Sequence, residues 1–275
     1  MTKNLRIIFD NAHDAATLTA TSEASNSLSI ENTQRSGRSY VWRSLNTEPQ
    51  VITASFNSPL SINGVVIYQH NFTALGRVRI EYLLDSRVVF DSGNLIASEL
   101  IPLGVWRAGV DPWGGDDLTE LPNVQLSVWT PDRFIDSYRI TINDPSNTAG
   151  FIQVARIVAG PAYSPKFNAS YNPKLDWVDS AEHKRTESGS INTINGNVYR
   201  RLTIDLDYLD ALDRSKLTRQ VLKRGKGADL YISLFPEMGG MTEAEHEFLA
   251  RRENDYGHTH NYFNNWQNQL VFIEV

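Results

Sequence analysis

Short segments in which apolar and polar residues alternate, separated by turn residues, recur along the first 160 positions of this 275-residue chain. The clearest example is the stretch 137–165, which opens with Tyr138, Ile140 and Ile142 alternating with polar residues. It turns at residues 144–147 and continues into a second apolar run that stops at 160–161 with Gly and Pro. A period of two is typical of a half-buried β-strand. The stretch therefore predicts two strands that pair with each other and close a sheet.

Other segments of the first 160 residues have the same character. Strands are predicted at 5–9, 17–24, 38–44, 51–56, 65–68 (entered through Ile62, Asn63 and Gly64), 78–82 and 88–90. Asp85 and Ser86 separate the last two of these, which predicts a hairpin, and a turn is predicted at 57–59 because of Pro59. This part shows no long amphipathic helix. We therefore predict an all-β sandwich or jelly roll.

The composition is that of an ordinary globular protein, with 41% hydrophobic and 21% charged residues. The length favours two domains, and we place them at 1–160 and 161–275. The N-terminus is too polar for a signal peptide, so we expect no export by the usual route. No apolar run is long enough to span a membrane. Cysteine is absent, and the formal net charge of -6 with scattered Lys and Arg argues against nucleic acid as a partner.

The second domain has a different pattern. Residues 197–208 alternate as one long half-buried strand whose apolar face is predicted to run through Tyr208, with Arg200 as the single charged residue on that face. A helix near 210–224 is predicted, with Asp210 as its N-cap and Gly225 beyond its last turn. Further elements are predicted as follows: strands at 230–234 and 270–275, a short helix over 242–249 that starts with a capping box, and a surface loop at 182–189.

Three segments of the first domain carry a family resemblance. QVITASFNSPLSINGVVIYQHN, GRVRIEYLLDSRVVFDSG and SYRITINDPSNTAGFIQVARIVAG together resemble the galactose-binding-like, or discoidin-like, jelly roll. The resemblance covers the first 160 residues. It implies the jelly-roll fold and carries over no ligand-binding residue.

The second domain carries another resemblance, in GNVYRRLTIDLDYLDALDRSKLTRQVLKRGKGADLYISLFPE. This run is similar to the β-sandwich with an associated helix of tail-tube and distal tail proteins of long-tailed bacteriophages. The resemblance implies a ring-forming homo-oligomer that joins other tail or baseplate proteins in the virion tail and is made in the host cytoplasm. In that family the tube-like domain usually comes first, whereas here the appended module would precede it.

The segment 101–131 holds the candidate binding residues, Trp106, Trp113 and Trp129, which are candidates for a protein interface or for stacking on a glycan. Its acidic residues Asp111, Asp116 and Asp117 are weak candidates for Ca²⁺ binding. These acids lack the spacing of a known Ca²⁺ loop, so we favour a solvated turn and predict no metal or cofactor.

No catalytic pattern is complete. His246 and Glu247 begin a zinc-protease motif, but position 250 is Ala where the second His is needed. His258 and His260 lack an evident third ligand. The chain has no serine-hydrolase elbow and no phosphate-binding loop, and the pair Asp205 and Asp207 is predicted to be solvated on the polar face of its strand. We therefore predict a protein that is not an enzyme.

The leading hypothesis is a structural component of a phage tail tip or baseplate that displays a jelly roll, with Arg200 as a candidate assembly contact. The alternative is a carbohydrate-binding module of a receptor-binding or adhesion protein, with Trp106 and Trp113 stacking on a host surface glycan. A third hypothesis, an accessory subunit of a cytosolic hydrolase, has no positive feature in the sequence.

Overall fold

The computed structural model describes residues 3–97, 100–101, 116–117 and 124–275. The chain forms two compact units, the first made of Met1–Tyr163 with Leu230–Phe248 and the second of Ser164–Asp229 with Leu249–Val275. Antiparallel strands dominate both units and helices are few, so the predicted mainly β class is confirmed. The domain boundary at residue 160 stays a prediction.

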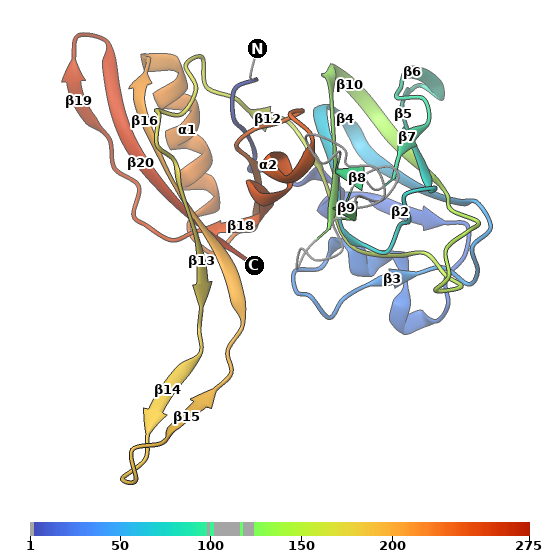
Figure 1. The fold of residues 1–275 in the computed structure, drawn as a ribbon. Helices are drawn as coiled ribbons and strands as arrows, with labels where there is room; N and C mark the ends of the chain where they lie inside the picture. Colours follow the sequence, from blue (N-terminus) through green and yellow to red (C-terminus); the bar gives the residue numbers. More distant parts are fainter. Residues whose placement is uncertain (1–2, 98–99, 102–115, 118–123) are drawn as a thin grey trace, which may run out of the picture. The chain divides into compact units, whose positions relative to one another are not determined.

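The first unit contains a large antiparallel sheet in the order β3-β11-β4-β10-β5-β6, with β2 paired to β4 and β7 paired to β5 (Figure 1). Its strands are β2 (Thr17–Ala20), β3 (Trp42–Arg43), β4 (Gln50–His70), β5 (Arg77–Leu84), β6 (Arg87–Asp91), β7 (Leu95–Ile96), β10 (Gln125–Asn143) and β11 (Gln153–Gly160). The predicted hairpin is confirmed, because β5 and β6 are joined at Asp85 and Ser86, both of which have positive φ as such tight turns require.

Two long strands run through both layers of a sandwich. The first part of β4 pairs with β2 and with the end of β10, whereas its second part pairs with β11 and the start of β10. The register between β4 and β10 shifts from Leu60 opposite Ile135 to Ser55 opposite Ser137. The turn predicted at 57–59 is therefore wrong. It is a bulge inside one continuous strand, a position at which Pro59 is tolerated although it lacks a backbone N–H.

The two strands of the stretch 137–165 do not pair with each other, contrary to the prediction. β4 lies between β10 and β11 in the sheet. The turn at 144–147 is present, and Asn147 N donates to Asp144 O there. The connection continues to residue 152 and carries the chain from the end of β10 to the far side of β4. Neighbours in sequence are often, but not always, neighbours in a sheet.

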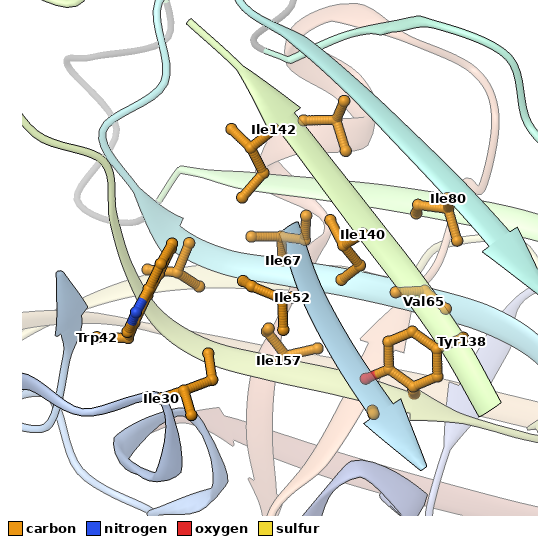
Figure 2. Packing of buried hydrophobic residues seen from close by; sticks show 14 of the residues in the cluster. Ile30, Trp42, Ile52, Val65, Ile67, Ile80, Tyr138, Ile140, Ile142 and Ile157 are labelled. Carbon is orange, nitrogen blue, oxygen red and sulfur yellow. The ribbon is translucent and has the colours of Figure 1, made fainter. Parts of the chain in front are cut away.

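The core of the sandwich lies between the two layers (Figure 2). Ile140 of β10 sits opposite Ile52 of β4 on one side and Ile80 of β5 on the other. Ile67 and Ile157 come from the other layer and point into the same cluster. These side chains are fully buried, as the alternation of apolar and polar residues requires.

The first unit also contains a smaller set of strands. β1 (Arg6–Ile8) lies between β12 (Ala162–Tyr163) and β17 (Leu230–Ser233), antiparallel to both. The remaining elements of this unit are β8 (Leu100–Ile101) and β9 (Asp116–Asp117), which pair with each other, the 3-10 turns η1 (Ala12–Ala15), η2 (Asn26–Leu28) and η3 (Ile30–Gln34), and the helix α2 (Gly240–Glu245).

The helix predicted over 242–249 is shorter and starts earlier than expected. It begins at Gly240, because the Glu243 carboxylate accepts hydrogen bonds from Glu237 N and Gly239 N just before it. Phe248 and Leu249 are buried in β18 (Glu247–Arg252) instead of lying on a helix.

The second unit is built on the antiparallel order β18-β20-β16-β13, with β19 also paired to β20. Its elements are β13 (Lys174–Asp179), β14 (Glu182–Arg185), β15 (Ile191–Ile194), β16 (Val198–Leu209), α1 (Ala211–Arg224), β19 (Thr259–Tyr262) and β20 (Asn265–Glu274). α1 contacts β16 and β20. Its predicted caps are confirmed, since the Asp210 carboxylate accepts from Asp213 N and Gly225 N donates to Val221 O.

Two details of this unit differ from the predictions. The prediction of a surface loop at 182–189 is wrong. Glu182–Arg185 pairs with Ile191–Ile194 in a two-stranded ribbon that extends from β13 and β16 (Figure 1). Every residue of those two strands is exposed, so no apolar alternation marks them in the sequence. Near the end of β16, a register shift between Leu206 and Leu209 leaves Tyr208 exposed and buries Leu209.

Candidate functional site

Most of the predicted binding residues of the segment 101–131 lie outside the described residues. This holds for Trp106, Asp111 and Trp113 and for the side chains of Asp116 and Asp117. Their roles in glycan, protein or Ca²⁺ binding stay predictions.

Trp129 is described, and its indole is engaged inside the first unit. The ring covers Gly64, where an added Cβ would come within 2.6 Å of the indole carbon Cζ3. The Arg6 guanidinium carbon lies 4.9 Å from the ring centroid, and the Tyr231 ring centroid is 6.3 Å away. Within the described part of the chain, the buried Nε1 has no hydrogen-bond partner. The contacts of Trp129 therefore support a packing role, and a glycan-stacking role stays a prediction.

Arg200 is wholly buried in the second unit. Its Nη2 lies 2.6 Å from Glu274 Oε1 and its Nε 3.0 Å from Glu274 Oε2, so the two side chains form a paired fork. The guanidinium is therefore engaged inside the unit. Its predicted role as an assembly contact stays a prediction, and its buried position gives that role no support.

The described residues bring together three connections at one end of the sandwich. We call this region the loop end and define it as residues 43–46, 70–76 and 144–153. Asn71 links them: its Nδ2 donates to Phe151 O at 2.9 Å, and its Oδ1 accepts from Gln153 N at 2.8 Å. Its carbonyl accepts from Asn147 Nδ2 at 2.8 Å. One polar side chain therefore fixes two loops against each other.

Asp144 is a buried hydrogen-bond acceptor that fixes the loop end. Its side chain is fully buried and accepts hydrogen bonds from Thr73 N at 2.8 Å, Thr73 Oγ1 at 2.6 Å and Asn147 Nδ2 at 3.2 Å. Ser44 adds a further tie, since its Oγ accepts from Ile152 N at 2.8 Å. Buried and satisfied polar networks of this kind make loops rigid.

Three side chains with flat groups, Arg43, Phe151 and Gln153, contact one another at this rigid base. The Arg43 guanidinium carbon is 4.0 Å from the centroid of the Phe151 ring. Arg43 Nε and Nη2 both donate to Gln153 Oε1, at 3.1 and 2.7 Å. All three residues are partly exposed. Leu45 and Leu75, at 68% and 70% exposure, are apolar residues of the same loops that face water.

His70, at the end of β4, is neutral. Burial lowers its pKa to about 3, and its ring stacks on Phe72 with centroids 4.1 Å apart. Its Nδ1 accepts from Phe72 N at 3.2 Å. The loop end therefore offers hydrogen bonding and flat surface, with Arg43 as the cation at its centre.

The described residues contain no cluster of three or more His, Cys, Asp or Glu that could hold a metal ion. His260 stacks on Trp266, with centroids 4.8 Å apart, and His258 lies beside Tyr256. Asp205 accepts from Gln269 Nε2 on the surface of the sheet. None of the described helices is both long and apolar enough to cross a membrane.

Sequence reasoning missed Arg43, Phe151 and Gln153. Arg43 and Gln153 are 110 positions apart, and they meet because β3 pairs with the start of β11. No local spacing marks that pairing, so the sequence holds no signal that would have found it.

Comparisons with known proteins add little to this geometry. No family model and no curated protein matches the chain. Among solved structures, chitosan-binding module 1 of a chitosanase/glucanase from Paenibacillus sp. IK-5 is 13% identical and covers 55% of this chain and 99% of its own, with a TM-score of 0.39. CpGH89CBM32-5 from Clostridium perfringens, in complex with GalNAc-β-1,3-galactose, is 13% identical over 55% of this chain and 100% of its own, with a TM-score of 0.38.

The lectin domain of lectinolysin, complexed with Lewis B antigen, is 10% identical over 58% of this chain and 98% of its own, again with a TM-score of 0.38. At TM-scores below 0.5, these similarities assign neither a ligand nor a family to the chain.

Proposed function

We propose that this protein is a non-enzymatic glycan-binding protein and that the loop end of its β-sandwich is the binding surface. The observation that carries the proposal is the Arg43 guanidinium, which lies over Phe151 and is clamped by Gln153 on loops that Asn71 and Asp144 hold in place.

The chemistry of sugars fits such a surface. A sugar ring presents neighbouring hydroxyls that accept and donate hydrogen bonds, and a guanidinium offers several donors in one plane. Planar side chains provide contact area for the C–H face of the ring at a small entropic cost. A preformed site also loses little conformational freedom on binding, which favours affinity for a small ligand. The proposal rests on these residues of the chain itself.

The test is a glycan array on the intact chain, followed by calorimetry with the best glycan. We expect Arg43→Ala to weaken binding at least tenfold, and Arg87→Ala, which removes an exposed arginine from β6, to leave it unchanged. A wild-type chain that retains no glycan would refute the proposal, as would equal affinity of the Arg43→Ala variant. If the double variant Trp106→Ala/Trp113→Ala alone abolished binding, the site would lie in the segment 101–131 instead.

A second candidate function is a structural role in a phage tail tip or baseplate, as the resemblance of residues 196–237 implies. No comparison supports this role. The observation in its favour is the ribbon β14–β15 with the adjoining parts of β13 and β16, where Trp177, Ile191, Ile194 and Val198 are 42 to 57% exposed. Exposed apolar side chains on a two-stranded ribbon are typical of a segment that binds another protein.

Light scattering and negative-stain microscopy of the intact chain test this second role. A closed ring that is lost in an Ile191→Ser/Ile194→Ser variant would support it. A monomer with an intact glycan site would favour the first proposal and count against this second role.

A further inference from the structure

The first unit contains a buried carboxyl group that the proposed function does not use. Glu247, at the start of β18, is only 4% exposed. Its Oε2 accepts a hydrogen bond from Ser127 Oγ of β10 at 2.9 Å. Beside it, Gln125 Nε2 donates to the carbonyl oxygens of Ala244 and Glu247, both at 3.0 Å. The first residues of β10 therefore hold the segment 240–248 through polar contacts centred on Glu247.

Among the described residues, no cation pairs with this carboxyl. β10 presents the uncharged side chains of Gln125 and Ser127, and β17 presents the phenol of Tyr231. α2 presents Glu243, which has the same charge as an ionised Glu247. From β1, the guanidinium of Arg6 donates to Glu237 Oε1 at 2.8 Å.

Lys3 pairs with the same Glu237 carboxylate, so Lys3 and Arg6 both have another acid as their partner. An ionised carboxylate at Glu247 would thus be buried beside a second acid. Burying such a charge is costly unless a cation compensates it.

Burial, and secondarily the negative charge of Glu243, raise the pKa of Glu247 to about 8, against the opposing effect of the neighbouring polar side chains of Ser127, Tyr231 and Gln125. The group is therefore protonated at neutral pH. Because this pKa lies above that of an unfolded glutamate, the stabilisation is complete below the unfolded value and is lost as the pH rises through the folded value.

We propose that Glu247 is a protonation-controlled latch, which holds the segment 240–248 against the start of β10 while its carboxyl is neutral and releases the segment when the carboxyl becomes charged. The latch is independent of the loop end, since none of its residues belongs to that region.

Hydrogen exchange of the intact chain, followed by mass spectrometry between pH 6 and 9.5 and corrected for intrinsic exchange, tests the latch. We expect peptides covering 125–129 and 240–248 to exchange at least tenfold faster at pH 9 than at pH 7, with a midpoint near 8. Peptides from the sandwich core, such as 138–142, should not change over this range.

Variants separate the latch from a general loss of stability. Glu247→Gln keeps a neutral, hydrogen-bonding side chain and should stay protected at pH 9. Glu245→Gln removes the same charge two residues away and should behave like the wild type. Ser127→Ala removes a donor that favours the charged form, so its midpoint should move to higher pH.

Opening of Glu247→Gln at pH 9 to the same extent as the wild type would overturn the proposal. Unchanged exchange of the wild-type segment between pH 7 and 9 would also overturn it. If Glu247→Gln fails to fold, the pH midpoint of exchange in Ser127→Ala tests the latch instead. A midpoint above that of the wild type supports the proposal and an unchanged midpoint overturns it, because loss of a merely structural hydrogen bond would not raise the midpoint.

Discussion

Arg200 and Glu274 form an ion pair in which both side chains are fully buried. Arg200 stands on the apolar face of β16, where its neighbours Leu202 and Ile204 pack into the interior. Its pairing with Glu274 compensates a positive charge that would otherwise be buried alone. Glu274 also accepts from Arg200 N at 3.0 Å, so one carboxylate satisfies both the side chain and the backbone of its partner.

Removing one member of this pair should be strongly destabilising. We expect Glu274→Gln to lower the free energy of unfolding by about 3–5 kcal/mol, since it leaves the guanidinium buried without its counter-charge. Urea unfolding followed by tryptophan fluorescence measures the loss. Glu253→Gln is the matched control, because Glu253 pairs with Arg201 at 2.6 Å where both side chains are over 40% exposed. Exposed pairs contribute roughly 0–1 kcal/mol, and similar losses in the two variants would contradict our account.

His13 makes the first unit sensitive to acid. Its ring is fully buried, with Nδ1 2.5 Å from Tyr138 Oη and Nε2 2.8 Å from Thr33 Oγ1. Burial, with a smaller effect of Arg156, lowers its pKa to about 3. An unfolded histidine titrates near 6.5, so below that pH the unfolded state binds more protons and stability falls by up to about 1.4 kcal/mol per pH unit.

Urea unfolding at pH 7 and pH 4.5 tests this dependence. His13→Gln should be less stable than the wild type at pH 7 and should lose less on acidification. The exposed His258→Gln should keep the wild-type dependence. His70 contributes in the same direction, so part of the acid sensitivity should persist in the His13→Gln variant. If His13→Gln lost as much stability between pH 7 and pH 4.5 as the wild type does, His13 would not be the source of the acid sensitivity.

Gly160 should not tolerate a side chain. A Cβ there would collide with the carbonyl oxygen of Asp10 and lie 3.1 Å from Ile8 Cγ2. Because the obstacle is backbone, we expect Gly160→Ala to cost roughly 1–3 kcal/mol. Gly227 has open space around its Cβ position, so Gly227→Ala should be neutral or slightly stabilising. Thermal unfolding of the two variants compares them directly, and a neutral Gly160→Ala would show that β1 and β11 can move apart.

The N-cap of α1 should contribute measurably to the second unit. Asp210 Oδ1 accepts from Asp213 N at 2.8 Å, and Asp210→Ala should destabilise the protein by about 1 kcal/mol. Asp207→Ala removes the same charge from the neighbouring strand and should change stability by less than about 0.5 kcal/mol. Equal effects would mean that the charge, and not the cap, matters.

Local chemistry in the sequence predicts local structure well here. Asp85 and Ser86 specify a tight hairpin whatever the rest of the chain does, and Asp210 with Gly225 bound α1 at the predicted positions. These features depend on contacts within a few residues, which a sequence displays directly.

Non-local pairing is where the predictions fail. Nothing in residues 137–165 shows that β4 will insert between β10 and β11, and nothing in Pro59 shows that β4 continues past it. Tyr208 fits an inward position by alternation and is turned outward by a bulge that only the partner strand β20 reveals.

The candidate sites follow the same division. Arg43 and Gln153 lie 110 positions apart in the sequence and meet because β3 pairs with β11. The sequence around either residue alone therefore does not indicate a role for Arg43. In the sequence, Glu247 is marked only by an incomplete zinc motif, because its burial and its lack of a cationic partner among the described residues arise only in the folded chain.

The route of β4 and β10 through both layers has a consequence during synthesis. Gln50 pairs with Ile142, so the β10-facing edge of β4 stays unpaired until the ribosome has added the intervening residues. At ordinary translation speeds of about 5–20 residues per second, that interval lasts roughly 5 to 18 seconds. During this interval the 21-residue strand has to avoid pairing with other nascent chains. Its centre is protected by the polar side chains of Asn57 and Ser58 and by Pro59, which lacks the backbone N–H that an added strand would need.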